Sequence, residues 1–302
     1  MVSSPPSARS LFTRRQFFKV SVCAVFGLGF YGCVIDRHWL QIVHSDVYLE
    51  GLPHQFEGYR IAQLSDIHID EFTEPFFVRE AVDRINALTP DAVFLTGDFV
   101  SHQLESEKFA EGSAWQCANI LTGLQCHNRY AILGNHDAMV GEDLVATALR
   151  DNGIPVLRNS FLPIERDGAR VWLAGLDDAL FGSPDPDKAI PAAIRNRPNE
   201  PVILLCHEPD YVDTVLRRPA GQAVDFILSG HTHGGQVRIP FVKPFHLPPL
   251  GRKYVHGWFN FGKAQLYVNR GLGTVGIPVR FDCPPEITLF TLRRPVAAVN
   301  KT

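Results

Sequence analysis

Short apolar runs alternate with longer amphipathic segments along this chain from Tyr59 onward. Each run is followed by a polar or glycine-rich turn, and apolar residues then recur at helical spacing, as Phe77, Ala81, Ile85 and Leu88 do. Such runs are typical of buried strands, and the helical spacing is typical of helices with one buried face. The predicted strands lie at 60–64, 92–95, 130–133, 171–174, 202–206, 226–228 and 265–268. The alternation predicts an α/β domain with helices covering central sheets.

A second helical pattern ends before Gly153, a plausible helix stop, and consists of Leu144, Val145, Ala148 and Leu149. The 302 residues, 45% of them hydrophobic, can build a substantial core. No stretch between 59 and 295 has the composition of a linker. We therefore expect one catalytic domain at 59–295, preceded by a lead-in strand region at 36–58.

The proline-rich stretch 239–250 is unusually apolar for a connection and predicts a long surface loop. It could simply pack over a sheet edge. Alternatively, it could form an apolar rim that admits a phospholipid or a lipid-linked diphosphate at a membrane.

The N-terminal region 1–35 has the layout of a twin-arginine export signal. Arg14 and Arg15 precede an uncharged apolar run at 20–35. An ordinary basic flank before a membrane anchor is the alternative, and at about 1.5 Å per residue the run is marginal for a full span. Both interpretations place this end at a bacterial cytoplasmic membrane. We expect the catalytic domain on the outer side, with the twin-arginine export machinery as a partner.

Net charge and cysteine content exclude several classes of protein. A net charge of -3 gives no basic field that would attract nucleic acid, so no specific nucleic-acid partner is expected. The six cysteines are scattered and contain no CxxC pair, which argues against a disulfide scaffold, a zinc finger or a thioredoxin-like site.

Ligand-type side chains follow most of the predicted strands. They are Asp66, His68, Asp98, Asn135, His136, His207, His231 and His233. Active sites of α/β folds gather at the carboxyl ends of strands, so these side chains should meet. Carboxylates, an amide oxygen and imidazoles suit divalent manganese, iron or zinc, and they outnumber the ligands that one ion holds. The sequence therefore predicts a site for two adjacent divalent ions.

The order of these motifs resembles the calcineurin-like metallophosphoesterases. The motifs are Asp66-Ile67-His68, Gly97-Asp98, Gly134-Asn135-His136-Asp137, His207 and Gly230-His231-Thr232-His233. The continuation Gly234-Gly235-Gln236 with the later Asn269-Arg270-Gly271-Leu272-Gly273, behind the twin-arginine pattern, is similar to the exported phosphodiesterase subgroup. The resemblance implies a β-sandwich flanked by helices, with the dimetal site at one edge.

The resemblance also implies a role for each residue. One ion would be held by Asp66, His68 and His233, the other by Asn135, His207 and His231, and Asp98 would bridge them. Ions about 3.5–4 Å apart can share and activate a water and hold both oxygens of an in-line phosphoryl displacement. His136 would contact the phosphate or protonate the leaving oxygen. Asp137 could orient a neighbouring imidazole.

Two further residues, Asn269 and Arg270, follow a predicted strand and could contact phosphate oxygens. A structural salt bridge is an equal alternative for Arg270. The sequence thus predicts a binuclear phosphoesterase that acts on phosphodiesters. The alternatives are a pyrophosphatase on a nucleotide-linked or lipid-linked diphosphate, a monoesterase, and a non-catalytic metal-binding or envelope-binding protein. The presence of both Asp98 and His136 disfavours the last, because a lapsed enzyme would be free to lose them.

Overall fold

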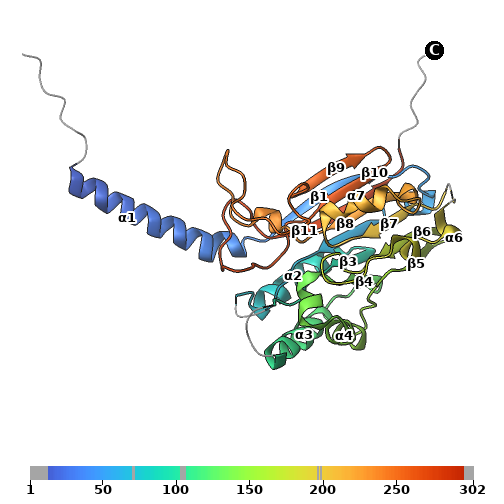
Figure 1. Cartoon of the computed structure of the whole chain (residues 1–302), viewed down its shortest axis with the longest axis horizontal. Coiled ribbons are helices and arrows are strands. Elements are labelled where there is room, and N and C mark those ends of the chain that lie inside the picture. Colours follow the sequence, from blue (N-terminus) through green and yellow to red (C-terminus); the bar gives the residue numbers. More distant parts are fainter. Residues whose placement is uncertain (1–12, 70–71, 103–106, 196, 198, 296–302) are drawn as a thin grey trace, which may run out of the picture.

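Two β-sheets pack face to face in the computed structural model, which describes residues 13–69, 72–102, 107–195, 197 and 199–295 (Figure 1). Within these residues the first sheet has five strands in the order β1-β11-β2-β3-β4, and the second has six in the order β5-β6-β7-β8-β10-β9. The strands are β1 Gln41–Tyr48, β2 Arg60–Leu64, β3 Ala92–Thr96, β4 Arg129–Ile132, β5 Ser160–Arg166, β6 Ala169–Gly175, β7 Val202–Leu205, β8 Val224–Ser229, β9 Gly257–Phe261, β10 Ala264–Val268 and β11 Glu286–Arg293.

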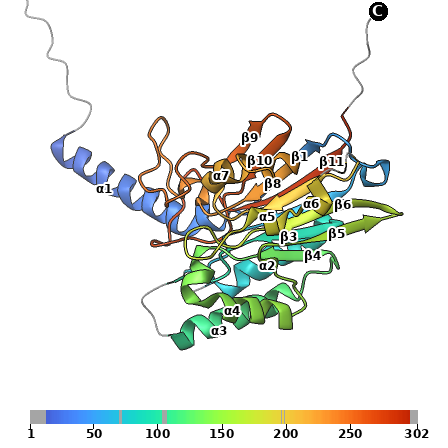
Figure 2. The same ribbon diagram turned by 45° about the vertical axis from the view of Figure 1, so that its right-hand side comes forward.

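Helices cover the outer faces of both sheets (Figure 2). They are α2 Pro75–Leu88, α3 Glu107–Leu121, α4 Asn135–Asp151, α5 Pro186–Ala189, α6 Ala192–Arg195 and α7 Val212–Leu216, whereas α1, Arg14–Phe30, covers neither sheet. Alternate residues of a strand face opposite sides of a sheet. In β3, Val93 and Leu95 pack with residues of α2, α3 and α4, whereas Phe94 packs between the two sheets. The predicted sandwich flanked by helices is confirmed.

The apolar runs located every inner strand except β11 and only one of the edge strands, β4. Each predicted strand is present with small differences at its ends. β1 lies within the lead-in strand region expected at 36–58, although no bounds were predicted for it, and β5, β9 and β11 were not predicted. Three of these, β1, β5 and β9, are edge strands, and partial exposure breaks their apolar runs. The fourth, β11, is buried on both faces: Ile287 and Leu289 pack toward the helices, and Phe290 and Leu292 pack between the sheets.

Strand pairing brings the carboxyl ends of several strands to one edge of the sandwich. Strands β2, β3 and β4 are mutually parallel, as are β7, β8 and β10. The amide of Gln63 links the two sheets by donating to the carbonyl of Ser229 at 3.0 Å. The loops that follow β2 and β8 are therefore neighbours, although 165 residues separate His231 from the Asp66 carboxylate that its backbone N–H contacts.

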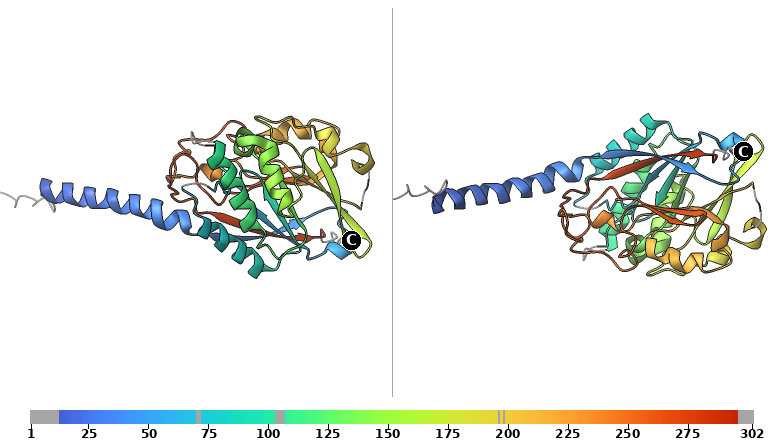
Figure 3. Two further views of the ribbon diagram at one scale, coloured as in Figure 1. Left: turned by 90° about the horizontal axis from the view of Figure 1, so that it is seen from below. Right: turned by 90° about the horizontal axis from the view of Figure 1, so that it is seen from above.

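Helix α1 projects away from the domain (Figures 1 and 3). Its first turn is capped by Thr13, whose hydroxyl accepts from the N–H of Gln16, while the Gln16 side chain accepts from the N–H of Thr13. The helix continues through a π-helical turn, Tyr31–Ile35, into Asp36–His38 and then β1. The segment Arg15–His38 spans 24 residues, contains an 18-residue stretch of mean hydropathy 1.8, and is long and apolar enough to cross a membrane. Region 36–58 contributes β1, which pairs with β11 in the first sheet.

Candidate metal centre

The ligand-type residues predicted from the strand ends form one buried cluster at the edge of the sandwich. Three overlapping groups hold their ligand atoms within 4.8 Å of one another: Asp66 with His68 and His233, Asp98 with His207 and His231, and Asp98 with His68 and His136. Asn135 belongs beside the second group because its Oδ1 lies 2.8 Å from His231 Nδ1. The first two groups coincide with the ligand sets that the family resemblance implies.

The spacing of the ligand atoms fits divalent ions. His68 Nε2 lies 3.4 Å and His207 Nε2 3.1 Å from the same oxygen, Asp98 Oδ2. His233 Nε2 lies 3.5 Å from Asp66 Oδ1 and 3.1 Å from His68 Nε2. Ligands at about 2.0–2.2 Å from one ion, at tetrahedral or octahedral angles, are themselves about 3–3.5 Å apart. Asp98 Oδ2 faces both groups, as a bridging ligand must.

Protonation states in the cluster also suit metal binding. Burial, and then the neighbouring His207, lower the pKa of His231 to about 4, and burial with His68 holds the pKa of His233 well below its usual value. Burial opposes ionisation of Asp98, but the His207 and His136 rings outweigh it and hold the Asp98 pKa well below its usual range. Neutral imidazole and ionised carboxylate are the forms that bind metal.

The orientation and protonation of the His207 ring indicate how it would bind a cation. Its Nδ1 lies 2.6 Å from the carbonyl oxygen of Thr96, which fixes the ring and turns Nε2 toward Asp98. Burial disfavours a charged ring, but the Asp98 carboxylate raises the pKa of His207 well above its usual value. The raised pKa favours a proton on His207, and a metal ion bound at Nε2 would displace that proton.

Backbone conformation gives a second, independent mark of the site. Positive φ angles, between 47° and 73°, occur at Asp66, His68, Asp98, His231 and His233. This left-handed region is disfavoured for residues with a Cβ, and such strain concentrates at functional sites. The strained turns point the side chains of successive loops toward one another.

Two glycines make room for the ligands. A Cβ on Gly134 would lie 2.6 Å from His207 Nε2, and a Cβ on Gly230 would collide with Ser65 and the Asp66 carboxylate. Real Cβ contacts are not this short, so only glycine fits at either position. This explains in physical terms why the Gly-Asn-His-Asp and Gly-His-Thr-His motifs begin with glycine.

Asp137 holds the backbone of the site rather than an imidazole, which differs from the role suggested for it from the sequence. Its carboxylate accepts the N–H groups of Asp98 at 2.8 Å, Gly134 at 3.0 Å and Phe99 at 2.9 Å. Burial, and then the Asp98 charge, raise the pKa of Asp137 to about 7. The side chain therefore ties the loop after β3 to the first turn of α4.

His136 presents a hydrogen-bond donor beside the ligands. Its Nδ1 accepts the backbone N–H of His102 at 2.9 Å, so the neutral ring carries its hydrogen on Nε2. Burial lowers the pKa of His136 to about 4, which keeps the ring neutral at neutral pH. The backbone N–H of His136 donates to Asp98 Oδ1 at 2.8 Å. His136 therefore offers an N–H group to an oxygen bound next to Asp98.

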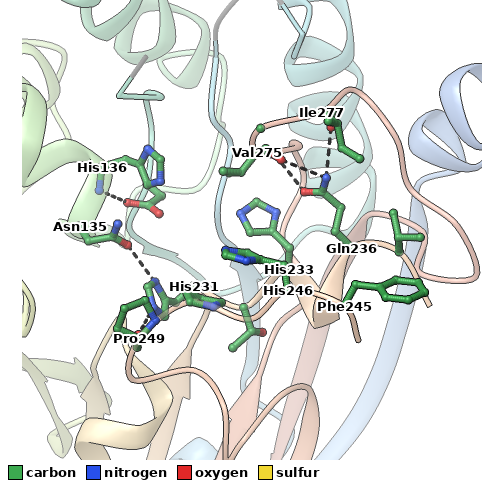
Figure 4. Close-up of a pocket in the computed structure, with 16 residues that line it drawn as sticks. Asn135, His136, His231, His233, Gln236, Phe245, His246, Pro249, Val275 and Ile277 are labelled. Carbon is green, nitrogen blue, oxygen red and sulfur yellow. Dashed lines mark hydrogen bonds between the residues drawn. The ribbon is translucent and has the colours of Figure 1, made fainter. Parts of the chain in front are cut away.

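A cavity of about 600 Å³ opens beside the cluster (Figure 4). One side, which we call the ligand wall, consists of Asp98, Asn135, His136, His231 and His233. The other side, which we call the apolar wall, consists of Val237, Phe245, Pro248, Val275 and Ile277. Figure 4 shows His136 and Asn135 across the cavity from Phe245 and Ile277. The cavity thus joins a candidate metal centre to an apolar surface.

The two residues suggested for phosphate contact, Asn269 and Arg270, lie behind the site. Asn269 is fully buried and bonds to Thr288 at 2.9 Å and to the N–H of Gly271 at 2.7 Å. Arg270 pairs with the buried carboxylate of Glu286. Neither residue lines the cavity. The structural salt bridge, given as the alternative for Arg270, is what the structure shows.

Arg280 was not identified from the sequence, although it contacts the site. It is fully buried and donates to the carbonyl groups of Gly273 and Cys283, each at 3.0 Å, while its Nη2 lies 3.4 Å from His233 Nδ1. Burial lowers its pKa. The loop it holds abuts the site, because the N–H of Gly273 donates to the Asp66 carbonyl at 2.7 Å. No spacing in the sequence marks an arginine as buried, since arginines are mostly exposed.

The sequence profile of the calcineurin-like phosphoesterases matches residues 59–235, more than half of the chain. The chain belongs to this family. It is 32% identical over 291 residues to the uncharacterized metallophosphoesterase YkuE of Bacillus subtilis, covering 93% of this chain and 98% of YkuE. It is 28% identical over 288 residues to the phosphodiesterase YaeI of Escherichia coli, covering 93% of this chain and all of YaeI. A Danio rerio transmembrane protein with a metallophosphoesterase domain is 28% identical over 276 residues, covering 88% of this chain and 60% of that protein.

Proposed function

We propose that this protein is a binuclear-metal-dependent phosphodiesterase held at a membrane by its N-terminal segment. The observation that carries the hydrolase activity is the pair of ligand groups meeting at Asp98 Oδ2 beside an open cavity. Two divalent ions there, of manganese, iron or zinc, would supply an activated water and polarise the phosphorus centre. The name of YaeI supports the diester assignment.

The charge of the cavity favours diesters over monoesters. Within the described residues that line it there is no arginine or lysine. A phosphate monoester brings about two negative charges at neutral pH, whereas a diester brings one. Because the ligand wall offers neutral His136 and Asn135 outside the metal charges, the singly charged ester fits it better. The cavity also leaves room for a second ester substituent along the apolar wall.

The chain's own residues have separate tasks in this proposal. Asp66, His68 and His233 would hold one ion, Asn135, His207 and His231 the other, and Asp98 would contact both. His136 would donate its Nε2 hydrogen to a phosphate oxygen or to the leaving oxygen. Asp137 and Arg280 keep the loops that carry these side chains in place.

A pyrophosphatase acting on a nucleotide-linked or lipid-linked diphosphate is the second candidate, because the same centre would serve a diphosphate and the apolar wall would suit a lipid.

Export is also part of the proposal. The apolar segment Arg15–His38 and the membrane-spanning name of the Danio rerio relative support a membrane location. The Arg14-Arg15 pair supports the twin-arginine route, with the catalytic domain on the outer side.

The test of the reaction is hydrolysis of bis-nitrophenyl phosphate and of nitrophenyl phosphate by the full chain in detergent with added manganese. We expect diester turnover that depends on metal and is lost in Asp98→Ala and His136→Ala. His44→Asn, at an exposed position on β1, serves as the matched control and should retain activity. Turnover of the monoester alone, or turnover that survives Asp98→Ala, would contradict the proposal.

A test of localisation uses a reporter fused after Thr302 in cells that have the twin-arginine export route. We expect the reporter outside the cytoplasm for the natural sequence and inside it for Arg14→Lys/Arg15→Lys. Equal external signal from both would exclude the twin-arginine route while leaving the enzyme assignment untouched.

A further inference from the structure

The apolar wall of the cavity continues onto an exposed apolar surface. Past Val237 the chain forms the long loop predicted at 239–250, which carries Ile239, Phe241, Val242 and Phe245. The Phe241 side chain is fully exposed and the Phe245 side chain is 72% exposed, so neither ring packs against a sheet edge. Ile277, on the facing segment, is 53% exposed. Packing over a sheet edge, the alternative given from the sequence, therefore does not account for these side chains.

Hydrogen bonds fasten one part of the apolar wall, the segment from Val275 to Ile277, to Gln236. The Gln236 side chain donates to the carbonyl groups of Val275 and Ile277, each at 3.1 Å, and accepts the N–H of Val275 at 2.9 Å. Both ends of this amide thus hold the segment that faces the loop. This part of the wall keeps its shape because the contacts use backbone groups, which do not depend on the apolar side chains themselves.

The same part of the wall is joined to the end of the N-terminal apolar segment. The N–H of Phe281 donates to the Gln236 carbonyl at 3.0 Å, and the N–H of Arg280 donates to the carbonyl of Gly32 at 3.1 Å. The rings of Tyr31 and Phe281 lie edge to face with centroids 6.0 Å apart. Gly32 is buried, and a Cβ there would lie 3.0 Å from the Arg280 carbonyl oxygen. The apolar segment is therefore linked to the cavity through two hydrogen bonds, from Arg280 to Gly32 and from Phe281 to Gln236.

These contacts fix where the cavity lies relative to a membrane. Figures 1 and 3 show α1 leaving the domain at the end that carries the loop 239–250. A bilayer that holds Arg15–His38 would therefore meet this end first, where Phe241, Val242 and Ile277 are exposed. Exposed apolar side chains next to a membrane segment are stabilised by entering the bilayer interface.

We propose that the substrate is a phosphate ester of a membrane lipid, whose phosphate binds at the ligand wall while its hydrocarbon chains lie along the apolar wall and reach the bilayer. This inference rests on the proposed function and names its substrate class. In the reaction, water supplies the oxygen of the new P–O bond, and the P–O bond to the leaving alcohol of a diester, or to the leaving phosphate of a diphosphate, breaks. The leaving oxygen takes up a proton. Phospholipid diesters and lipid-linked diphosphates share this chemistry.

The test uses the full chain reconstituted in vesicles that contain either phosphatidylglycerol or undecaprenyl diphosphate. The soluble headgroup glycerophosphoglycerol and bis-nitrophenyl phosphate are assayed in parallel. We expect at least one of the two lipids to be hydrolysed with a kcat/KM more than tenfold above that of the soluble headgroup. The two vesicle preparations distinguish a diester substrate from a diphosphate.

The double variant Phe241→Ser/Val242→Ser tests the membrane-facing loop. We expect its lipid turnover to fall at least fivefold while hydrolysis of bis-nitrophenyl phosphate stays unchanged. Tyr48→Ser removes a half-exposed aromatic ring from the last residue of β1, at the end of the strand far from α1, and should alter neither rate.

Three results would overturn the inference. The first is that neither lipid is hydrolysed faster than glycerophosphoglycerol. The second is that the double variant Phe241→Ser/Val242→Ser loses turnover of the lipid and of bis-nitrophenyl phosphate equally. In both cases hydrolysis of bis-nitrophenyl phosphate by the natural sequence would still leave the phosphodiesterase proposal standing. Failure on every substrate, the chromogenic diester included, would overturn the proposed function together with the inference.

Discussion

The two walls of the cavity are built in different ways. The ligand wall consists of buried polar side chains that bond to one another and to strained turns. His231 is an example, because its ring contacts Asn135 and its backbone N–H donates to the Asp66 carboxylate. The apolar wall consists of loop residues that are partly exposed, with Phe245 and Ile277 open to solvent on one side. The first wall is fixed by many contacts per residue, and the second by a few backbone hydrogen bonds.

From this difference we expect the ligand wall to determine the hydrolytic reaction and the apolar wall to determine which substrates are selected. Changes in the ligand wall should remove hydrolysis of every substrate, because each side chain there contacts the reacting group or a neighbour that does. Changes in the exposed part of the apolar surface should alter the turnover of lipid substrates and leave the turnover of soluble substrates unchanged. The predictions below test this separation, beginning with the largest expected effect.

Replacing the residue shared by both ligand groups should abolish activity. Asp98→Ala removes the carboxylate oxygen that lies 3.4 Å from His68 Nε2 and 3.1 Å from His207 Nε2. We expect kcat/KM for a soluble diester and for a lipid substrate to fall by roughly three orders of magnitude, or about 4 kcal/mol. Steady-state kinetics on both substrates check this. A variant that loses only one substrate would break the proposed separation.

Removing the donor beside the ligands should cost less and leave the metals bound. His136→Asn deletes the Nε2–H group while its backbone N–H to Asp98 remains possible. We expect kcat to fall by about 10²-fold with unchanged metal content by elemental analysis. Loss of metal in this variant would show that His136 is a ligand instead.

Adding a methyl group under the ligand wall should destabilise the fold. In Gly230→Ala the new Cβ would collide with Ser65 and Asp66, and overpacking of this kind costs about 1–3 kcal/mol. Gly112→Ala is the matched control, because open space surrounds Gly112 within α3, and alanine there should stabilise the helix by about 0.5–1 kcal/mol. Thermal melts of the two variants should therefore shift in opposite directions.

The protonation state of His136 can be followed directly in the metal-free protein. Its pKa is lowered to about 4 from 6.5, so the ring stays neutral as the pH falls through 6 and gains its proton only near pH 4. Because the folded pKa is depressed, the unfolded chain binds this proton first, and His136 lowers stability as the pH falls from about 6.5 toward 4. NMR titration of the ring, assigned with His136→Asn, checks this. A midpoint near 6.5 would indicate a solvated ring.

The sequence predicted the ligand wall better than the rest of the molecule. Motifs such as Gly134-Asn135-His136-Asp137 identify their residues because chemistry restricts which side chains can bind metal. Sequence could not place Arg280 or the direction of the Asn269 and Arg270 side chains, since burial and long-range pairing decide both. The positive φ angles of Asp66 and the other ligands also leave no mark in the residue types.

The edge strands and the apolar wall show the same limit. β1 and β5 have interrupted apolar runs because one side of each strand lacks a partner. The loop at 239–250 is recognisable as unusually apolar, but its sequence left both packing and substrate contact open. The hydrogen bonds from Phe281 to Gln236 and from Arg280 to Gly32, together with the ring contact of Tyr31 and Phe281, connect the apolar wall to the membrane segment.

The central claim is that two metal ions meet at Asp98 and drive hydrolysis. The most direct measurement is elemental analysis of manganese per chain, taken with diester turnover on the same samples of natural protein and Asp98→Ala. The account predicts two ions per chain with activity in the natural protein, and fewer than two ions with no activity in the variant. One ion per chain in the fully active protein, or two ions retained with full activity in Asp98→Ala, would contradict it.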